Sequence, residues 1–196
     1  MRTDDIQPDG AVPDPRDELV NHISAMRAFA FSLARNDAQA DDLVQEALEK
    51  AWKNIASFKP GTNMQAWLFT ILRNTFYSHH RKHKREVSDP DGIAAERLAE
   101  KPAHDGRLQM NEFLAAFATL PAEQREALAL VGASGYSYEE AAEMCGVKIG
   151  TIKSRANRGR ARLMDLLHAD GNGYSDMTDR ATTAVVNAGL QGRLTA

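Results

Sequence analysis

A run of six basic side chains without a single acid lies between residues 148 and 162. Lys and Arg neutralise DNA phosphates and can also reach guanine in the major groove. Ordinary surface helices usually mix the two signs, with acids spaced to pair with bases. The run therefore predicts contact with DNA rather than a merely solvated face. Its members that follow one another on a predicted helix are Lys153, Arg155, Arg158, Arg160 and Arg162.

A second basic stretch, residues 64–85, contains five Lys or Arg residues, no acid, several aromatic residues and Asn74. Bases of single-stranded DNA stack on aromatic rings while their phosphates follow positive charge. This composition indicates a surface for unstacked DNA at the basic end of the stretch. Taken alone, Trp67 and Phe69 are each more typical of core packing, because aromatic residues dominate cores generally.

The other reactive residue types form no recognisable catalytic or metal-binding group in the sequence. His79 and His83 are four residues apart and could share a metal ion, but their basic surroundings favour a surface for single-stranded DNA instead. Cys145 has no second cysteine to pair with, so we expect it to pack as a small hydrophobic residue. We expect no catalytic residue, metal or cofactor, and an enzyme is the class that the sequence favours least.

The first basic run is preceded by the signals of a helix-turn-helix unit. Ser137 and Glu140 have the spacing of a capping box, and Gly146 suits the left-handed end of a short helix. A second helix is expected from about Ile149 to Leu167. Two helices joined by a glycine-containing turn place the second helix in the DNA major groove.

The rest of the chain predicts further helices at about 16–35, 38–54, 64–84, 108–119 and 122–131. Turn and cap signals separate them, with Asp37 expected as an N-cap and Pro121 at a first helical position. Their apolar stripes are expected to be buried, including Ile23 and Trp52. The polar face of the second helix would, on composition alone, be a solvated surface.

The expected fold is all-α, with two small helical domains joined by a flexible linker. The first is a three- to four-helix bundle and the second a four-helix helix-turn-helix domain. Residues 86–147 carry a charge balance of −8 and separate the two basic segments. The predicted divisions are a disordered leader at 1–15, domains at 16–85 and 108–168, a linker at 86–107 and a tail at 169–196. The sequence does not decide whether the domains lie together or apart.

Four fragments in this order resemble an extracytoplasmic-function (ECF) sigma factor of the sigma-70 family. They are ADDLVQEALEKAW at 40–52, SFKPGTNMQAWLFTILRNTF at 57–76, LPAEQREALAL at 120–130 and GVKIGTIKSRANRGRARL at 146–163. The residues of these fragments are most similar to those of the EcfG type, the general-stress-response sigma factor of alphaproteobacteria. The resemblance covers about residues 16–168 and implies a σ2 domain, a σ4 domain and promoter recognition with RNA polymerase.

The resemblance implies three sets of site residues. The −35 element would be read or held by Lys153, Ser154, Arg155, Asn157, Arg158, Arg160 and Arg162. The −10 element would be captured by Ser57, Lys59, Asn63, Trp67, Asn74, Arg81 and Lys82. The β′ clamp helices of core RNA polymerase would dock on Asp41, Asp42, Gln45, Glu46 and Glu49.

The implied partners are core RNA polymerase (β′ clamp helices and β flap), promoter DNA and a small, NepR-like anti-sigma factor. No signal peptide or membrane span is visible, so we expect a cytoplasmic protein with no membrane partner and no small-molecule substrate. Two alternatives stay open. A sigma-mimicking decoy would bind only an anti-sigma factor, but it would not need a basic recognition helix. A helix-turn-helix repressor would leave the first domain unexplained.

Overall fold

The computed structural model describes residues 14–86 and 105–169, and all regular structure in these two ranges is helical. Most of the expected leader, linker and tail lies outside the described residues. We call the first group of helices the N-terminal bundle: α1 (Pro15–Leu19), η1 (Val20–His22), α2 (Ile23–Ala34), α3 (Asp37–Lys53), η2 (Ile55–Ser57) and α4 (Met64–Glu86). The C-terminal bundle contains α5 (Asp105–Ala118), α6 (Ala122–Leu128), η3 (Ala129–Ala133), α7 (Tyr138–Cys145) and α8 (Ile149–Ala169).

The single helix expected at 16–35 is interrupted. The chain tightens into the 3₁₀ turn η1 between α1 and α2, where Val20, Asn21 and His22 all have modest helix propensity. The helical stripe then re-forms, and Met26, Phe29 and Leu33 are buried as expected. The prediction for Ile23 was wrong, because its side chain is 38% exposed.

Two helix starts in the N-terminal bundle are fixed by asparagine side chains. Asn36, not Asp37, is the N-cap of α3, and its Oδ1 accepts a hydrogen bond from Gln39 N at 3.0 Å. Asp37 instead occupies the first turn, where a negative charge suits the positive end of the helix dipole. Asn63 caps α4 by accepting from Ala66 N at 3.0 Å.

Helix α3 buries small residues rather than its tryptophan. Ala40, Ala47 and Ala51 are almost completely buried, which lets α3 approach α2 and α4 closely. Trp52 is 56% exposed, so the prediction that it belongs to the core was wrong. Its ring is covered on one side by the Arg16 guanidinium, which lies 5.1 Å from the ring centroid.

The helix-turn-helix unit of the C-terminal bundle forms as the sequence predicts. Ser137 N donates to Glu140 Oε2 at 2.8 Å, and Glu140 N donates to Ser137 Oγ at 3.1 Å, which completes the capping box. Gly146 ends α7 with φ of 63°. Two boundaries differ from expectation: α5 begins at Asp105, and Pro121 is the N-cap of α6 rather than its first residue.

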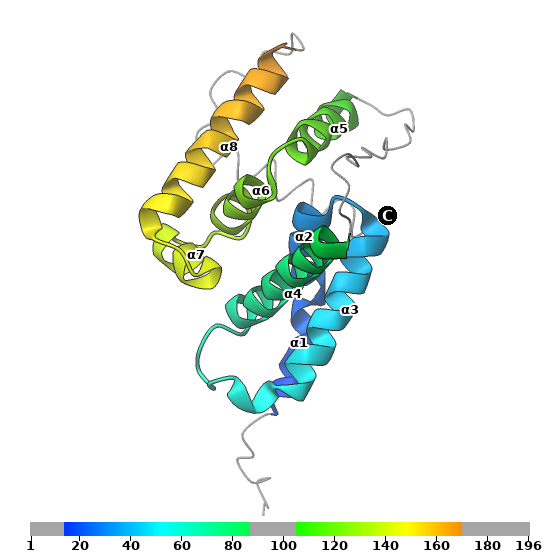
Figure 1. Ribbon diagram of the computed structural model, residues 1–196, viewed down its shortest axis with the longest axis vertical. Coiled ribbons are helices and arrows are strands. Elements are labelled where there is room, and N and C mark those ends of the chain that lie inside the picture. Colours follow the sequence, from blue (N-terminus) through cyan, green and yellow to red (C-terminus); the bar gives the residue numbers. More distant parts are fainter. Residues whose placement is uncertain (1–13, 87–104, 170–196) are drawn as a thin grey trace, which may run out of the picture.

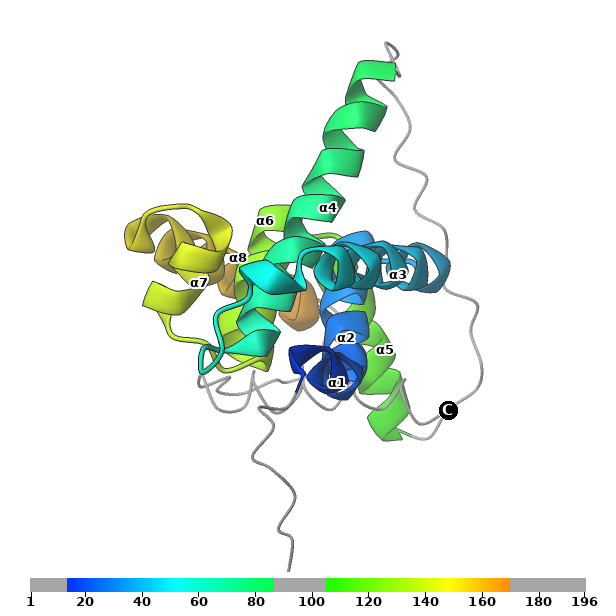
Figure 2. The ribbon, with the colours of Figure 1, turned by 90° about the horizontal axis from the view of Figure 1, so that it is seen from below.

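The two bundles pack against one another (Figures 1 and 2), which answers the question that the sequence left open. Helix α4 contacts α7, and α2 contacts α6. The Phe69 ring meets the Tyr136 ring edge-on, with centroids 6.2 Å apart. The far end of α4 projects beyond the other helices in Figure 2. Among the described residues, no helix has both the length and the apolar character that a membrane span requires.

Candidate nucleic-acid interface

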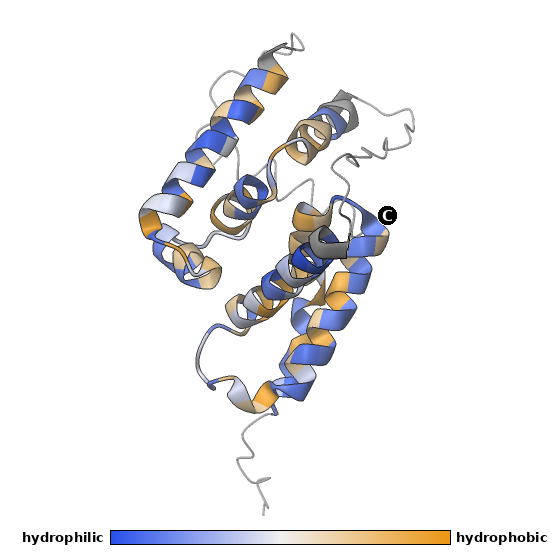
Figure 3. Ribbon diagram, viewed as in Figure 1, coloured by the Kyte–Doolittle hydropathy of each residue, from blue (hydrophilic) through white to orange (hydrophobic). Residues whose placement is uncertain are grey.

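Helix α8 exposes four of the seven predicted −35 residues. Ile152, Ala156 and Leu163 are buried against the rest of the C-terminal bundle. The predicted residues that are exposed are Lys153, Asn157, Arg158 and Arg162, and Figure 3 shows hydrophilic residues over much of the visible face of α8. This surface can present Lys, Arg and Asn donors to base edges and phosphates.

Tyr138, at the start of α7, organises two cations of α8. The Lys153 ammonium lies 5.5 Å from the centroid of the Tyr138 ring, and Arg160 Nη1 donates to the Tyr138 hydroxyl at 3.2 Å. Arg160 Nη1 also donates to Asn157 Oδ1 at 3.2 Å. Arg160 is therefore held against its own domain. Arg158 is held less firmly, because the hydrogen bond from its Nε to the Ser154 carbonyl is long, at 3.3 Å.

Arg155 is less exposed than Lys153, Asn157 and Arg158 on the same helix. It is half-buried, its Nη1 is enclosed, and its charge acts on Glu126 of α6. Glu126 is completely buried, and two side chains of α4 contact its carboxylate. Arg73 Nε lies 2.7 Å from Glu126 Oε1, and the Tyr77 hydroxyl lies 3.2 Å from Glu126 Oε2.

Burial raises the pKa of the Glu126 carboxyl above its ordinary value, and the positive charge of Arg73 opposes that effect. The pKa of the Tyr77 hydroxyl is also raised, first by burial and then by the Glu126 charge, so this hydroxyl stays protonated and can donate. The Glu126 carboxylate therefore joins α6 to the basic helix α4 through Arg73 and Tyr77.

Four of the predicted −10 residues lie between η2 and the first turn of α4. Ser57 Oγ donates to the Asn54 carbonyl at 2.8 Å, which fixes the turn, and Lys59 is exposed beyond it. Trp67 is half-buried against Phe58, with ring centroids 5.4 Å apart. Asn63 reaches the C-terminal bundle, where its side chain hydrogen-bonds to Tyr136.

Farther along α4, Asn74, Arg81 and Lys82 are exposed, so the basic surface continues toward the projecting end of the helix. Phe69 is 1% exposed and stacks on Phe29 at 4.5 Å, which excludes it as a platform for bases. Phe76 is half-buried and stacks on His80 with centroids 6.2 Å apart. Partly exposed aromatic rings followed by cations are the combination that single-stranded DNA requires.

Some acidic residues of α3 form ion pairs within the N-terminal bundle, and others do not. Asp41 is held by Arg27 through two contacts of 2.6 and 3.1 Å, and Glu49 lies 3.8 Å from Lys53. Asp42 and Gln45 are exposed beside them. These four residues point to one side of the helix, away from the buried alanines.

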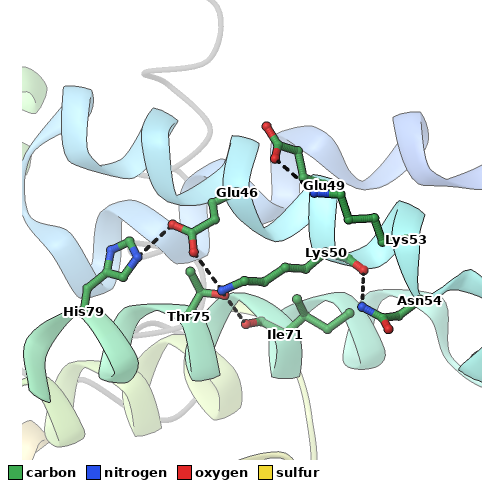
Figure 4. Close-up of polar contacts among 8 residues, drawn as sticks. All are labelled: Glu46, Glu49, Lys50, Lys53, Asn54, Ile71, Thr75 and His79. Carbon is green, nitrogen blue, oxygen red and sulfur yellow. Dashed lines mark hydrogen bonds and ion pairs between the residues drawn. The ribbon is translucent and has the colours of Figure 1, made fainter. Parts of the chain in front are cut away.

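Glu46 instead turns toward α4 (Figure 4). Its carboxylate lies 2.7 Å from Lys50 Nζ and 2.7 Å from His79 Nε2. Lys50 also donates to Thr75 Oγ1 at 3.0 Å. The hydrogen bond from Lys50 and the charge of His79 hold the pKa of Glu46 below its usual value. Glu46 therefore joins α3 to α4 instead of presenting a carboxylate outward.

Sequence reasoning missed two residues of these surfaces. Trp52 lies seven residues after Gln45 and three after Glu49, so it shares their outward side of α3. The sequence shows that spacing, but the apolar character of Trp52 led to the prediction that it is buried in the core. Nothing in the sequence indicated the role of Tyr138, because its contacts to α8 depend on the angle between α7 and α8.

The described residues contain no group of three His, Cys, Asp or Glu side chains placed to hold a metal ion. His79 is engaged with Glu46 rather than with His83. Cys145 is buried, and burial raises the pKa of its thiol to about 12, so the reactive thiolate is absent at neutral pH.

Comparison with known proteins gives matches along both bundles. The family models Sigma-70 region 2 and Sigma-70, region 4 match residues 19–86 and 110–163. The ECF RNA polymerase sigma factor EcfG of Rhodopseudomonas palustris is 55% identical over 156 residues, which cover 80% of this chain and 86% of that protein.

Two solved structures agree with this match. The sigma factor RpoE of Bartonella quintana, crystallised in complex with the anti-sigma factor NepR, is 53% identical with a TM-score of 0.70, and the match covers 81% of this chain and 99% of that one. CnrH, solved in complex with the cytosolic domain of CnrY, is 27% identical with a TM-score of 0.55, covering 79% and 87%. The chain therefore belongs to the ECF RNA polymerase sigma factors, which bind core RNA polymerase and direct it to promoters.

Proposed function

We propose that this protein is a general-stress sigma factor of the EcfG type, in which residues 16–85 bind polymerase and the −10 element and residues 108–168 bind the −35 element. The observation that carries the assignment is the acid-free basic stretch of α8 up to Arg162, with exposed cations, together with a basic α4 that carries exposed cations near its end. The proposal is supported by the similarity to EcfG over most of the chain.

The −35 surface consists of two groups with different tasks. Lys153, Asn157 and Arg158 are exposed near the N-terminal half of α8, which is the part of a recognition helix that reaches base edges. Ser154 is half-buried among them. Arg162 lies farther along and contacts phosphates, whereas Arg160 reaches phosphates only after leaving Tyr138 and Asn157, and Arg155 is half-buried.

The −10 surface captures unpaired bases between the 57–63 turn and the exposed part of α4. Extruding a base costs a few kcal/mol, and stacking with polar contacts to the base offsets that cost. Trp67 provides a half-exposed ring, Asn63 and Asn74 provide amide groups, and Arg81 and Lys82 follow the phosphates.

The polymerase surface is the outer side of α3, formed by Asp42, Gln45, Glu49 and the exposed Trp52, with Asp41 at its edge. Glu46 contributes by fixing α3 to α4, so that polymerase docking sets the position of the −10 helix. Tryptophan is enriched among the interface residues that dominate binding energy, since it offers a large rigid area at low entropic cost.

Trp52→Ala is expected to weaken binding to core RNA polymerase by about 1–3 kcal/mol, because an apolar anchor is lost. Fluorescence anisotropy of labelled protein titrated with core polymerase measures this. Val20→Ala is the matched control, since Val20 is also an exposed apolar residue, at 65%, but lies outside the α3 face. If wild type and the Trp52 variant bound polymerase equally well, Trp52 would not belong to the polymerase-binding surface.

Regulation follows the same family resemblance. We propose that a small NepR-like anti-sigma factor binds the chain and withholds it from polymerase, a proposal supported by the 53% identity to the Bartonella quintana protein that was crystallised with NepR. The protein acts in the cytoplasm, where polymerase and promoters are, and its role is to bind and position rather than to catalyse.

The test is multi-round transcription by bacterial core RNA polymerase, with and without this protein, on a promoter with a GGAAC-type upstream element. Run-off RNA that requires both proteins is expected, and mutation of either promoter element should abolish it. Absence of transcript together with tight anti-sigma binding would identify a decoy. Absence of transcript with binding to duplex DNA alone would identify a repressor.

A further inference from the structure

Tyr138 is the first residue of α7, and its own bundle holds both its backbone and its ring. Ser137 and Glu140, on either side of it in the chain, bond one another's backbone N–H groups, which fixes the start of the helix. The ring is half-buried and packs against the buried apolar cluster of the C-terminal bundle. Because α7 packs against α8, this rigid side chain lies at the edge of the proposed −35 surface.

Helical spacing brings three polar residues of α8 to the side of that helix that meets Tyr138. Lys153, Asn157 and Arg160 are four and then three residues apart, so they follow one another along one stripe. Lys153 and Asn157 are exposed, whereas Arg160 is half-buried. One side chain of α7 can therefore act on all three.

The ring of Tyr138 orders the first of these residues. The Lys153 ammonium lies 5.5 Å from the ring centroid, within the distance of about 6 Å at which an aromatic face attracts a cation. A free lysine side chain samples many rotamers, and ordering them when DNA binds costs free energy. The contact with the ring restricts Lys153 before DNA binds.

The hydroxyl of Tyr138 acts on Asn157 through Arg160. Arg160 Nη1 donates both to the Tyr138 hydroxyl and to Asn157 Oδ1, each at 3.2 Å. This nitrogen carries two hydrogens, so it can make both bonds at once. A chain of hydrogen bonds therefore runs from the start of α7 to an exposed amide of α8.

This chain determines which end of the Asn157 amide is left for DNA. A guanidinium has donors but no acceptor, so Arg160 selects the amide orientation in which Oδ1 faces it. The Nδ2 end is then left to donate to a base. Acceptors for such a donor in the major groove are N7 of either purine, O6 of guanine and O4 of thymine.

We propose that Tyr138 is a positioning residue for −35 recognition, which orders Lys153 with its ring and Asn157 through Arg160 and so sets base choice without reading a base itself. The inference rests on the assignment of α8 as the −35 helix. It gives Arg160 a task other than phosphate binding, since the guanidinium is directed at Tyr138 and Asn157. Loss of Arg160 then changes which base is preferred rather than weakening binding to every sequence.

The experiment measures binding of the full chain with core polymerase to promoters in which each −35 position carries all four bases in turn. Asn157→Ala and Lys153→Ala identify the base pair that each residue reads. Tyr138→Phe keeps the ring and removes the hydroxyl, so discrimination should fall about three- to tenfold at the Asn157 pair and stay unchanged at the Lys153 pair. Tyr138→Leu removes ring and hydroxyl, so discrimination should fall at both pairs.

Further variants separate positioning from stability. In the Asn157→Ala background, Tyr138→Phe is expected to have no further effect on base choice, because the group through which the hydroxyl acts is gone. Arg160→Met should relax only the Asn157 pair, whereas loss of a phosphate contact would weaken binding to every sequence and lower the salt slope by about one. Ser137→Ala removes the cap of α7 but none of these side chains, so it should keep the wild-type base preferences.

Unchanged discrimination in Tyr138→Phe and Tyr138→Leu would overturn the inference, as would an equal loss at every −35 position. A loss that Ser137→Ala reproduces would also overturn it, because Tyr138 would then act only through the stability of α7. A wild-type chain that shows no base preference at the −35 positions would instead contradict the assignment of α8, on which the inference rests.

Discussion

Arg125→Met is expected to lower the free energy of unfolding by about 3–5 kcal/mol, the largest effect of any single substitution considered. The guanidinium donates to three carbonyls, those of Ser32, Leu33 and Leu120, and all of these contacts are buried. Methionine fills a similar volume but cannot donate, so three buried acceptors lose their partner at once. Burial lowers the pKa of Arg125 to about 10, which leaves the side chain charged at neutral pH.

Urea denaturation followed by circular dichroism measures this change. Arg35→Met is the matched control, because it removes the exposed cap at Ala118, and its cost should stay below about 1 kcal/mol. Arg125→Lys should fall between the two, since an ammonium keeps the charge but cannot reach three carbonyls in the planar geometry of a guanidinium. A loss of less than about 1 kcal/mol for Arg125→Met would contradict a structural role for this group.

Replacing Arg158 or Lys153 by Ala is expected to cost about 1–3 kcal/mol of −35 binding and to relax base choice at the contacted position. Both side chains are exposed on the half of α8 that we propose to reach base edges. Binding of the full chain with core polymerase to promoters that vary at each −35 position measures both effects. Unchanged base preference in the Arg158 variant would show that the assumed rotation of α8 in the groove is wrong.

Arg162→Ala is the comparison on the same helix. We expect it to weaken binding about equally for all sequences and to reduce the slope of log affinity against log salt by about one, as for the loss of one phosphate contact. Arg160 is less suited to that comparison, because it is bonded to Tyr138 and Asn157, and its removal would also disturb α7.

Local signals in the sequence account for much of the fold. The capping box of Ser137 and Glu140 and the left-handed Gly146 form as predicted, because each depends on residues only a few positions apart. The same holds for the acid-free basic stretch of α8 up to Arg162, which follows from helical periodicity and charge. Errors arose where periodicity had to predict burial: Ile23 and Trp52 are apolar but exposed, since the neighbouring helices cover only part of each stripe.

The sequence by itself determined the family, the all-helical class and the two basic helices, because these depend on composition and spacing along one chain. Tertiary structure alone decided which charged side chains are available to bind DNA or polymerase. Glu46 joins α3 to α4, Arg73 pairs with Glu126, and Arg125 is buried against the carbonyls of α2. Arg125 and Ser32 are 93 residues apart, and no local pattern specifies such a pair. A charge in a sequence shows what it can bind, but packing decides whether it faces DNA, polymerase or the protein itself.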